Sequence, residues 1–428
     1  YQDLPEELII TPMRVHQRYF ATRHKDGTLA PFFMCVAGTE TVDGGKRVIQ
    51  GNEMVLRARL ADARFFFETD KKILLEQRTQ ALSQQIFHHR LGTVAERLPR
   101  LQAWGRLLQN LFQKEACFRE VRLQDRERAV TLCKTDLGTE AVKEFPELQG
   151  IMGGYYAALQ GESPAVAIAI QEHYRPQGVK DAVPETPLGV LLALADKWEM
   201  IWSLFQIEER PTGSKDPFAL RRAAFGIIRI LETHHLSLNL AFLFQQYAPP
   251  GAETVAAACI SFFKERLRGR LKDMGISVSV SSALLEQQEE LDIWRVIERA
   301  PLLQTFLGTP EGEDLLQGYR RLTHILQSLP KEEGVAPLTP SLFTTPEQTL
   351  HQALGVVQQA ASFLGESIAD FQKYLTLLAT LRPPLDAFFE GVLVACPDPT
   401  LRRNRQALLE AVRSCYEHLC AFSYLEGA

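Results

Sequence analysis

Gly213 to Glu232 reads GSKDPFALRRAAFGIIRILE, and the neighbouring chain is organised around this stretch. Asp216 is a good N-cap because its side chain can accept a hydrogen bond from a free amide, and Pro217 suits the first helical position. One apolar stripe then follows at helical spacing: Leu220, Ala224, Ile227, Ile228 and Leu231. Arg222 and Arg229 fall on the opposite face. Two faces of different chemistry predict a helix with two neighbours, or with one neighbour and a ligand.

The chain on either side of this helix is predicted to be mainly helical. Upstream, residues 82–209 carry a helical pattern, which we expect to be broken at Pro99, Pro146, Pro164 and Pro184. Downstream, residues 238–247 continue the helical stack until Pro249-Pro250-Gly251, the best domain boundary in the second half. The later segments are predicted as follows: a short strand or loop at 276–282, helices within 292–328, a surface loop at 330–346, and helices at 347–381, 385–394 and from 398 onward.

Strands are predicted only in the first 70 residues. Residues 7–11, 18–22 and 31–37 have strand character, and Asp26-Gly27 supplies a turn between the last two. Residues 53–68 are then predicted to form a helix. We expect its buried side to carry Val55, Ala58, Leu60, Ala61, Phe65 and Phe66.

Positive charge gathers in two places in the second half. Between Cys259 and Met274, one predicted helix carries five cations and only two acids: Lys264, Arg266, Arg268, Arg270 and Lys272, with Glu265 and Asp273. Three more arginines crowd the first turns of the last helix, where the helix dipole favours acids: Arg402, Arg403 and Arg405. Contacts with a polyanion explain both groups, and ion pairs with the acidic background are the alternative.

Composition limits the possible functions. The 428 residues include 52 acids and 47 lysines and arginines, so the formal charge of −5 excludes a generally basic nucleic-acid coat. Seven scattered cysteines without a CxxC pair predict reduced thiols, a cytoplasmic location and no zinc site of the usual spacing. No apolar run is long enough to suggest a membrane span.

Several long stretches, all in one order, resemble the β subunit of bacterial glycyl-tRNA synthetase. They are residues 13–33 (MRVHQRYFATRHKDGTLAPFF), 51–72 (GNEMVLRARLADARFFFETDKK), 146–157 (PELQGIMGGYYA), 192–197 (LALADK), 215–224 (KDPFALRRAA) and 383–412 (PPLDAFFEGVLVACPDPTLRRNRQALLEAV). The resemblance covers nearly the whole chain, and ordered matches of this length are far more specific than a short motif. Because members carry a further N-terminal region, we interpret the chain as a fragment.

The resemblance implies a mainly α multidomain fold. Residues 1–80 would be an α+β segment, the remainder of a domain that contacts tRNA or a partner. Residues 81–250 would be a degenerate HD-like helical domain with a helical linker, and residues 251–428 an anticodon-binding helical domain similar to that of arginyl-tRNA synthetase. Such a module reads unpaired bases by stacking, for which Phe262 and Tyr416 are candidates, although each fits a core position better.

An HD phosphohydrolase needs histidines and aspartates that share a divalent metal. Asp136 and Asp196 stand where the HD aspartates belong, but Thr135 occupies the place of the preceding histidine, and His88 and His89 cannot be assigned to a ligand position. We therefore expect no metal and no catalytic residue in this chain, with Asp136 and Asp196 as capping or hydrogen-bonding groups. A metal-dependent phosphohydrolase is one alternative function, and a non-catalytic scaffold for subunit assembly is another.

The resemblance implies that the chain is part of glycine–tRNA ligase. It would bind glycine tRNA and orient it for aminoacylation by the α subunit, or by a fused α part, where ATP and Mg²⁺ are expected. The assembly would be an αβ hetero-oligomer or a fused dimer. The candidate RNA-binding residues are Arg57, Arg59, Arg222, Arg229, Lys264, Arg266, Arg268, Arg270, Arg402, Arg403 and Arg405. For Arg57 and Arg59, simple solvation on an amphipathic helix is the alternative.

Overall fold

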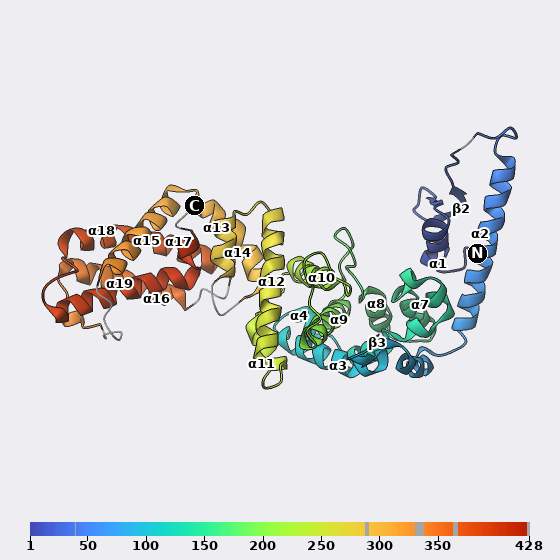
Figure 1. The fold of residues 1–428 in the computed structure, drawn as a ribbon, viewed down its shortest axis with the longest axis horizontal. Coiled ribbons are helices and arrows are strands. Elements are labelled where there is room, and N and C mark those ends of the chain that lie inside the picture. The colour runs from blue at the N-terminus through green and yellow to red at the C-terminus, as the bar shows by residue number, and fades with distance from the viewer. Residues whose placement is uncertain (39, 287–290, 330–337, 363–366, 426–428) are drawn as a thin grey trace. The chain divides into compact units, whose positions relative to one another are not determined.

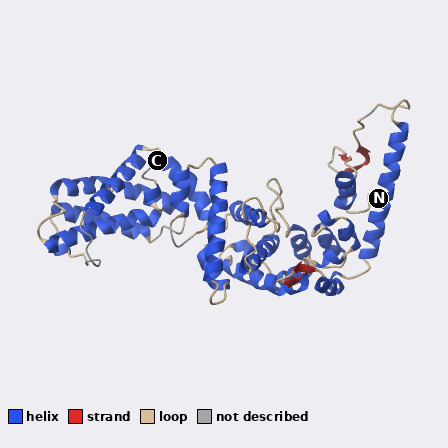
Figure 2. Cartoon of the chain, viewed as in Figure 1, coloured by secondary structure: helices blue, strands red, loops and turns tan. Residues whose placement is uncertain are grey.

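The computed structural model describes residues 1–38, 40–286, 291–329, 338–362 and 367–425, which are mostly helical (Figure 1). The strands described there form two small antiparallel sheets of two strands each (Figure 2). The chain divides into two compact units, of which unit 1 holds Tyr1–Leu236 and Pro249–Val255, and unit 2 holds Ser237–Ala248 and Ala256–Ala428. The mainly α class with a small α+β segment at the start is confirmed. The three-domain division at 80/81 and 250/251 stays a prediction.

Unit 1 begins with a helix, a hairpin and a long helix. These are α1 (Glu6–Thr11) with a short π-helix (Pro12–His16), β1 (Phe20–Arg23), β2 (Leu29–Met34) and α2 (Lys46–Asp70). The strand expected at residues 7–11 is wrong, because Glu6 and Glu7 suit the first turn of a helix, where the dipole favours acids. The predicted hairpin is confirmed, and the Asp26 carboxylate accepts a hydrogen bond from the Thr28 amide (3.0 Å) in its turn.

The buried side of α2 differs from the predicted one. The structure buries a stripe spaced i, i+4, i+7 and i+11: Leu56, Leu60, Ala63 and Phe67. Of the six side chains expected inside, Leu60 is buried, Phe66 is half-buried, and the other four are exposed. The prediction failed because two sides of this helix are apolar, so the periodicity alone does not choose between them.

The rest of unit 1 is a helical stack around α9. Its elements are β3 (Ile86–His88), β4 (Gly92–Thr93), α3 (Val94–Leu111), α4 (Ala116–Arg119), α5 (Leu123–Leu132), α6 (Glu140–Glu144), α7 (Ile151–Leu159), α8 (Pro164–Glu172), α9 (Pro187–Gln206) and α10 (Leu220–Thr233). The side chains of α9 are buried almost throughout, because α3, α8 and α10 all pack against it. Pro99 lies inside α3 and does not end it, whereas Pro164 occupies the first position of α8 as expected.

The stretch at 213–232 forms α10 as predicted, but the helix begins three residues later than expected. Ala219 has φ 55° and ends a turn that starts at Asp216, so Leu220 is the first helical residue. The Asp216 carboxylate still accepts hydrogen bonds from the amides of Leu220 (2.8 Å) and Arg221 (3.0 Å). The predicted stripe from Leu220 to Leu231 is buried.

Unit 2 is a separate helical body. Its elements are α11 (Leu240–Tyr247), α12 (Glu253–Asp273), α13 (Val278–Leu285), α14 (Ile293–Leu307), α15 (Pro310–Ser328), α16 (Thr345–Ala361), α17 (Ile368–Ala379), α18 (Arg382–Gly391) and α19 (Pro399–Leu419). Helix α19 packs against α15 and α16, and α16 packs against α18. Asp398 caps α19 as predicted, accepting from the amides of Thr400 and Leu401.

Two expectations for unit 2 need correction. Most of the stretch 276–282 is helical rather than strand or loop: α13 begins at Val278, because Ser277 caps its start by accepting a hydrogen bond from the Val280 amide (3.3 Å). Of the surface loop expected at 330–346, residues 330–337 lie outside the described residues, and α16 already begins at Thr345. None of the helices in the described part of the chain has the length and apolar character needed to cross a membrane.

Candidate functional site

Lys134 and Asp196 form a buried ion pair in unit 1. Lys134 lies just after α5, and its Nζ is 2.7 Å from Oδ1 of Asp196, in the middle of α9. The same Nζ is 2.9 Å from Nε2 of His173 and lies 3.8 Å from the centre of the Tyr174 ring. Since Nδ1 of His173 donates to the Ile170 carbonyl (2.6 Å), Nε2 carries the lone pair that accepts from Lys134.

Three further ion pairs extend this centre toward α3. Arg97 lies with Nη2 3.2 Å from Oδ1 of Asp196, and its Nε pairs with Glu199. Arg100 brings its Nε to 2.8 Å from the other oxygen of Glu199, which also accepts from the Ser203 hydroxyl (2.8 Å). Each buried acid therefore faces at least one cation, which offsets the cost of removing these charges from water.

Asp136 is held differently, by backbone amides that reach one of its two oxygens, whereas its buried Oδ1 has no hydrogen-bond partner among the described residues. Its Oδ2 accepts from the amides of Gly150 (2.5 Å) and Gly153 (3.1 Å) at the start of α7. Gly150 has φ 79°, a conformation that side-chain-bearing residues rarely adopt, so glycine is needed to aim this amide at the carboxylate. The interpretation of Asp136 as a hydrogen-bonding group is confirmed.

Burial and charge shift the pKa values here in opposite directions. Burial raises the pKa of Asp136 from its ordinary 3.8 to about 6, against the opposing effect of the two glycine amides and Lys134. Burial alone would also raise the pKa of Asp196, but Arg97 and Lys134 hold it well below its ordinary value. Burial and the Lys134 charge keep the pKa of His173 well below its usual range. At neutral pH, Asp196 is therefore ionised and His173 is neutral.

These residues do not fit a divalent metal. A metal would need the lone pairs of Asp196 and His173, and both are directed at the Lys134 ammonium. His88 packs against the Phe218 ring (5.3 Å between centroids), and His89 is exposed. Across the described residues, no group of three or more His, Cys, Asp and Glu is placed to hold a metal ion.

Sequence reasoning found the two aspartates but missed their partners. Lys134, which pairs with Asp196, stands two residues before Asp136, and this nearby lysine was the available signal that the chain itself supplies the neutralising cation. Lys197 directly follows Asp196, but its Nζ donates to the carbonyls of Tyr174 (3.2 Å) and Arg175 (2.9 Å) instead. Arg97 and His173 come from distant parts of the sequence, and without the fold nothing links them to this centre, whereas Glu199 lies only three residues after Asp196 on α9.

Three of the five cations on α12 already have acidic partners. Lys264 and Arg268 share Glu286, the first at 3.8 Å, while Arg266 pairs with Glu265 (2.6 Å). Arg266 also lies over the Phe262 ring, 5.1 Å from its centre. Phe262 is buried, as expected for a core position. The cation cluster is thus partly neutralised, and Lys272 and Arg268 are its most exposed members.

The three arginines of α19 have different surroundings. Arg405 is buried, with Nε 2.9 Å from Glu347, and it donates to the Leu393 carbonyl (2.8 Å). Arg402 donates to the Cys396 carbonyl (3.3 Å), and Arg403 is exposed. The ion-pair interpretation therefore describes Arg405 well. A contact between Arg405 and an RNA phosphate stays a prediction, and the buried Arg405 is not among the phosphate contacts that we propose.

The remaining candidate RNA-binding residues lie in unit 1. Arg57 is exposed on α2, whereas Arg59 pairs with Glu144 (3.1 Å) on α6. Arg222 is exposed on α10. Arg229 donates to the carbonyls of Gly178 (3.0 Å) and Asp181 (2.8 Å), which ties the loop after α8 to α10. The eleven candidates are divided between the two units, and their RNA contacts stay predictions.

Comparison with known families identifies the context of these surfaces. The family model described as glycyl-tRNA synthetase beta subunit matches residues 1–286. The chain belongs to the glycyl-tRNA synthetase β-subunit family. This confirms the resemblance, and it favours the ligase interpretation over the metal-dependent phosphohydrolase.

Relatives within the β-subunit family match along the whole chain. A glycine–tRNA ligase beta subunit from Rhodospirillum centenum is 42% identical, with 100% of this chain and 60% of the relative covered. Those from Phenylobacterium zucineum and Ruegeria sp. are 41% and 37% identical, each with 100% of this chain and 62% of the relative covered. The chain therefore spans about three fifths of the length of these β subunits.

Proposed function

We propose that this chain is the tRNA-binding β-subunit part of glycine–tRNA ligase. It recognises glycine tRNA and orients it for ATP-dependent aminoacylation by the α subunit, or by a fused α part. The observation that carries the proposal is the family match over residues 1–286, together with relatives named glycine–tRNA ligase beta subunit that match along the full chain. We place the reaction in the cytoplasm and the ATP and Mg²⁺ at the α subunit, in an αβ hetero-oligomer or a fused dimer.

The contribution of this chain to the reaction is positional. Holding the acceptor end of a tRNA beside an activated amino acid makes aminoacyl transfer effectively unimolecular, which lowers the entropic part of the barrier. The charged centre of unit 1 supports this role, because Lys134, Arg97 and their acidic partners bind one another and so fix the helices around α9. The centre thereby stabilises a rigid body on which tRNA contacts can be held.

Exposed cations are the proposed phosphate contacts. On a chain with a net charge of −5, a polyanion is held by local cations that lack acidic neighbours. Arg57, Arg222 and Lys272 are exposed and make no ion pair among the described residues, so they are the first phosphate contacts that we propose. Arg268 is exposed on α12 but pairs with Glu286, and Arg403 is exposed on α19. Arg266 and Arg270 are half-buried on α12, and Arg266 pairs with Glu265, so these two are secondary candidates.

The test is direct binding of this chain to glycine tRNA over a salt series. A second tRNA, identical except for an altered anticodon, is the matched control. We expect selective binding to the first, with each neutralised phosphate adding roughly 0.7–0.9 to the slope of log affinity against log salt.

Each other outcome contradicts part of the proposal. Equal binding to both tRNAs would contradict the prediction that residues 251–428 read the anticodon. Absence of binding to either tRNA would overturn a tRNA-binding role for this chain and favour the scaffold alternative. A metal-dependent phosphohydrolase is not proposed, because Lys134 occupies the lone pairs that a metal would need.

A further inference from the structure

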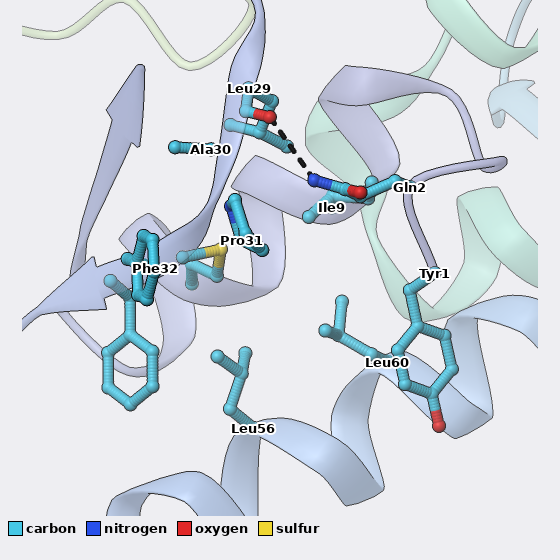
Figure 3. Close-up of a pocket in the computed structure, with 11 residues that line it drawn as sticks. Tyr1, Gln2, Ile9, Leu29, Ala30, Pro31, Phe32, Leu56 and Leu60 are labelled. Atoms are coloured by element: carbon cyan, nitrogen blue, oxygen red, sulfur yellow. Dashed lines mark hydrogen bonds between the residues drawn. The ribbon is translucent and has the colours of Figure 1, made fainter. Parts of the chain in front are cut away.

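The cavity between the hairpin β1–β2 and α2 does not suit an anionic ligand such as RNA. It has a volume of about 290 Å³, and its lining includes Ile9, Phe32 and Leu60 but no charged residue (Figure 3). Figure 3 also shows the Gln2 side chain donating to the Leu29 carbonyl (3.3 Å). An anion needs a cation that the fold leaves without a close counter-charge, and unit 1 contains such a cation elsewhere.

Arg126 on α5 is buried without a close carboxylate. Among the described residues, the other buried arginines are Arg78, Arg97 and Arg405, and each lies within 3.2 Å of a carboxylate oxygen of a buried acid. Arg126 is only 2% exposed, yet the acid that it pairs with is Glu127, 3.5 Å from Nη2 and with its side chain 53% exposed. Its Nε has no hydrogen-bond partner in the described part of the chain. The fold therefore neutralises this buried charge poorly.

The Arg126 side chain lies beside a second arginine, on α3. A Cβ added at Gly105 would lie 3.6 Å from Cδ of Arg126, so this side chain runs along α3, where its Nη1 donates to Oε1 of Gln109. Arg106 follows Gly105, is exposed, and makes no ion pair among the described residues. Burial lowers the pKa of Arg126 from its ordinary value; Glu127 opposes this effect, whereas the Arg106 charge adds to it. A bound anion would stabilise both like charges.

The start of α5 adds a positive helix end at the same place. Among the described residues, no side chain caps this helix of ten residues, and Arg126 is its fourth residue. Helical side chains lean toward the N-terminus, so Arg126 lies over the first turn. Gln109 holds it there, because its Nε2 donates to the Val121 carbonyl (2.8 Å), two residues before α5. The acid of the first turn, Asp125, pairs with Arg122 (2.9 Å). Uncapped amides at the start of a helix favour anions such as phosphate.

We propose that Arg106, Arg126 and Gln109 form a phosphate-binding site where α3 meets the start of α5. The two guanidinium groups bind the phosphate oxygens, and Gln109 orients Arg126. Arginine suits this ligand because its planar fork can donate two parallel hydrogen bonds to a phosphate. The phosphate belongs to the tRNA backbone or to a free phosphate compound. The RNA source rests on the proposed function, whereas the site itself does not.

Glu127 is the group that a phosphate would displace. Its carboxylate is 3.5 Å from Nη2 of Arg126 and its side chain is half-exposed, so turning it into solvent costs little. The site therefore makes opposite predictions for two exposed neighbours. Arg106→Gln should weaken phosphate binding, and Glu127→Gln should strengthen it. A purely structural role of these side chains predicts no such pair of opposite effects.

The first arm of the test uses inorganic phosphate and the 428-residue chain. Its melting temperature is measured in phosphate and in chloride at equal ionic strength. We expect phosphate to raise the transition of unit 1 by roughly 2–4 °C more in the wild type than in Arg106→Gln, because a bound ligand stabilises the folded form. Glu127→Gln should enlarge the rise. Lys143→Gln, which removes an exposed cation from α6, is the matched control and should keep the wild-type rise, since salt exclusion acts on all variants alike.

The second arm measures the tRNA affinity of the same variants over a salt series. A backbone phosphate in the site predicts a slope of log affinity against log salt that is smaller by roughly 0.7–0.9 in Arg106→Gln, with tighter binding in Glu127→Gln and no change in Lys143→Gln. Effects in the first arm alone would make a free phosphate compound the ligand. Absence of tRNA binding by the wild type would overturn the proposed function, while the first arm would still decide this site.

Arg126→Met separates a ligand site from a structural contact. Because the buried charge is costly without an anion, this variant should melt no lower than the wild type in chloride and should lose the specific response to phosphate. A much lower melting temperature in chloride would show that the fold already satisfies the guanidinium, which would overturn the proposal. Wild-type behaviour of both Arg106→Gln and Glu127→Gln in both arms would overturn it as well.

Discussion

The ammonium of Lys134 lies where Asp196, His173 and the Tyr174 ring converge in unit 1. The lysine ammonium has three N–H donors and no lone pair. It can neutralise a carboxylate and hydrogen-bond to it where a metal cation would bind, but it cannot activate water as a metal does. The centre therefore keeps the carboxylates expected of a metal site while the chain supplies the positive charge. This arrangement stabilises the fold of unit 1, and its contribution to the free energy of unfolding can be measured.

Lys134→Met should destabilise unit 1 by about 3 kcal/mol, the lower end of the range for breaking a buried pair, because Arg97 still faces Asp196. Unfolding by denaturant, followed by circular dichroism, measures the change. Adding Asp196→Asn to Lys134→Met should recover part of the loss, because it removes the uncompensated carboxylate. A single variant as stable as the wild type would contradict the role given to Lys134.

Asp136 makes the stability of unit 1 depend on pH. Its pKa is raised from 3.8 to about 6 in the folded state, so the folded form binds the proton more tightly than the unfolded form. The protonated Asp136 therefore adds its full contribution to the free energy of unfolding below pH 4, and this contribution is lost as the pH rises through 6. Relative to Asp136→Asn, the wild type should lose about 2 kcal/mol of unfolding free energy between pH 4 and pH 7. A difference that stays constant with pH would contradict the raised pKa.

At the scale of elements, the sequence predicts a helix well when only one of its sides is apolar. Helix α10 has one apolar side, and its stripe from Leu220 to Leu231 was predicted correctly. Helix α2 has two apolar sides, and the predicted stripe was mostly the exposed one, because the choice depends on which neighbours are present.

The helix α13 was missed because its serine and valine residues favour strand or turn locally, and tertiary packing overrides that preference. The cations of α12 were found, but not the acid Glu286 that faces two of them.

Glu286 provides a test of α12 as an RNA-binding element. It pairs with Arg268 and lies 3.8 Å from Lys264, so Glu286→Gln frees two cations without moving the helix. We expect tighter tRNA binding in Glu286→Gln and weaker binding in Lys272→Glu, with the salt slope changed by roughly one in opposite directions. Fluorescence anisotropy over a salt series measures both. If both variants keep the wild-type slope of log affinity against log salt, the prediction that α12 contacts tRNA is wrong.

At the scale of the whole molecule, the described chain is two bodies with separate cores. Leu194 on α9 is buried in unit 1, and Leu408 on α19 is buried in unit 2, both with no exposed surface. Residues distant in the sequence meet within each body, as Arg97 meets Asp196 in unit 1 and Arg405 meets Glu347 in unit 2. The domain boundary predicted at Pro249-Pro250-Gly251 stays a prediction. The return of Pro249–Val255 to unit 1 could not be predicted from the sequence, because it depends on contacts between residues distant in the chain.

Separate cores predict separate unfolding transitions, because a two-state description fails when bodies are stabilised independently. Leu194→Ala should lower one calorimetric transition and Leu408→Ala the other, each by roughly 6–12 °C for a cavity costing about 3 kcal/mol. Lys134→Met should move the same transition as Leu194→Ala, which assigns that transition to unit 1. A single transition that all three variants shift equally would show instead that the two bodies unfold as one cooperative unit. The proposed tRNA contacts on α2 and α12 would then depend on one shared stability.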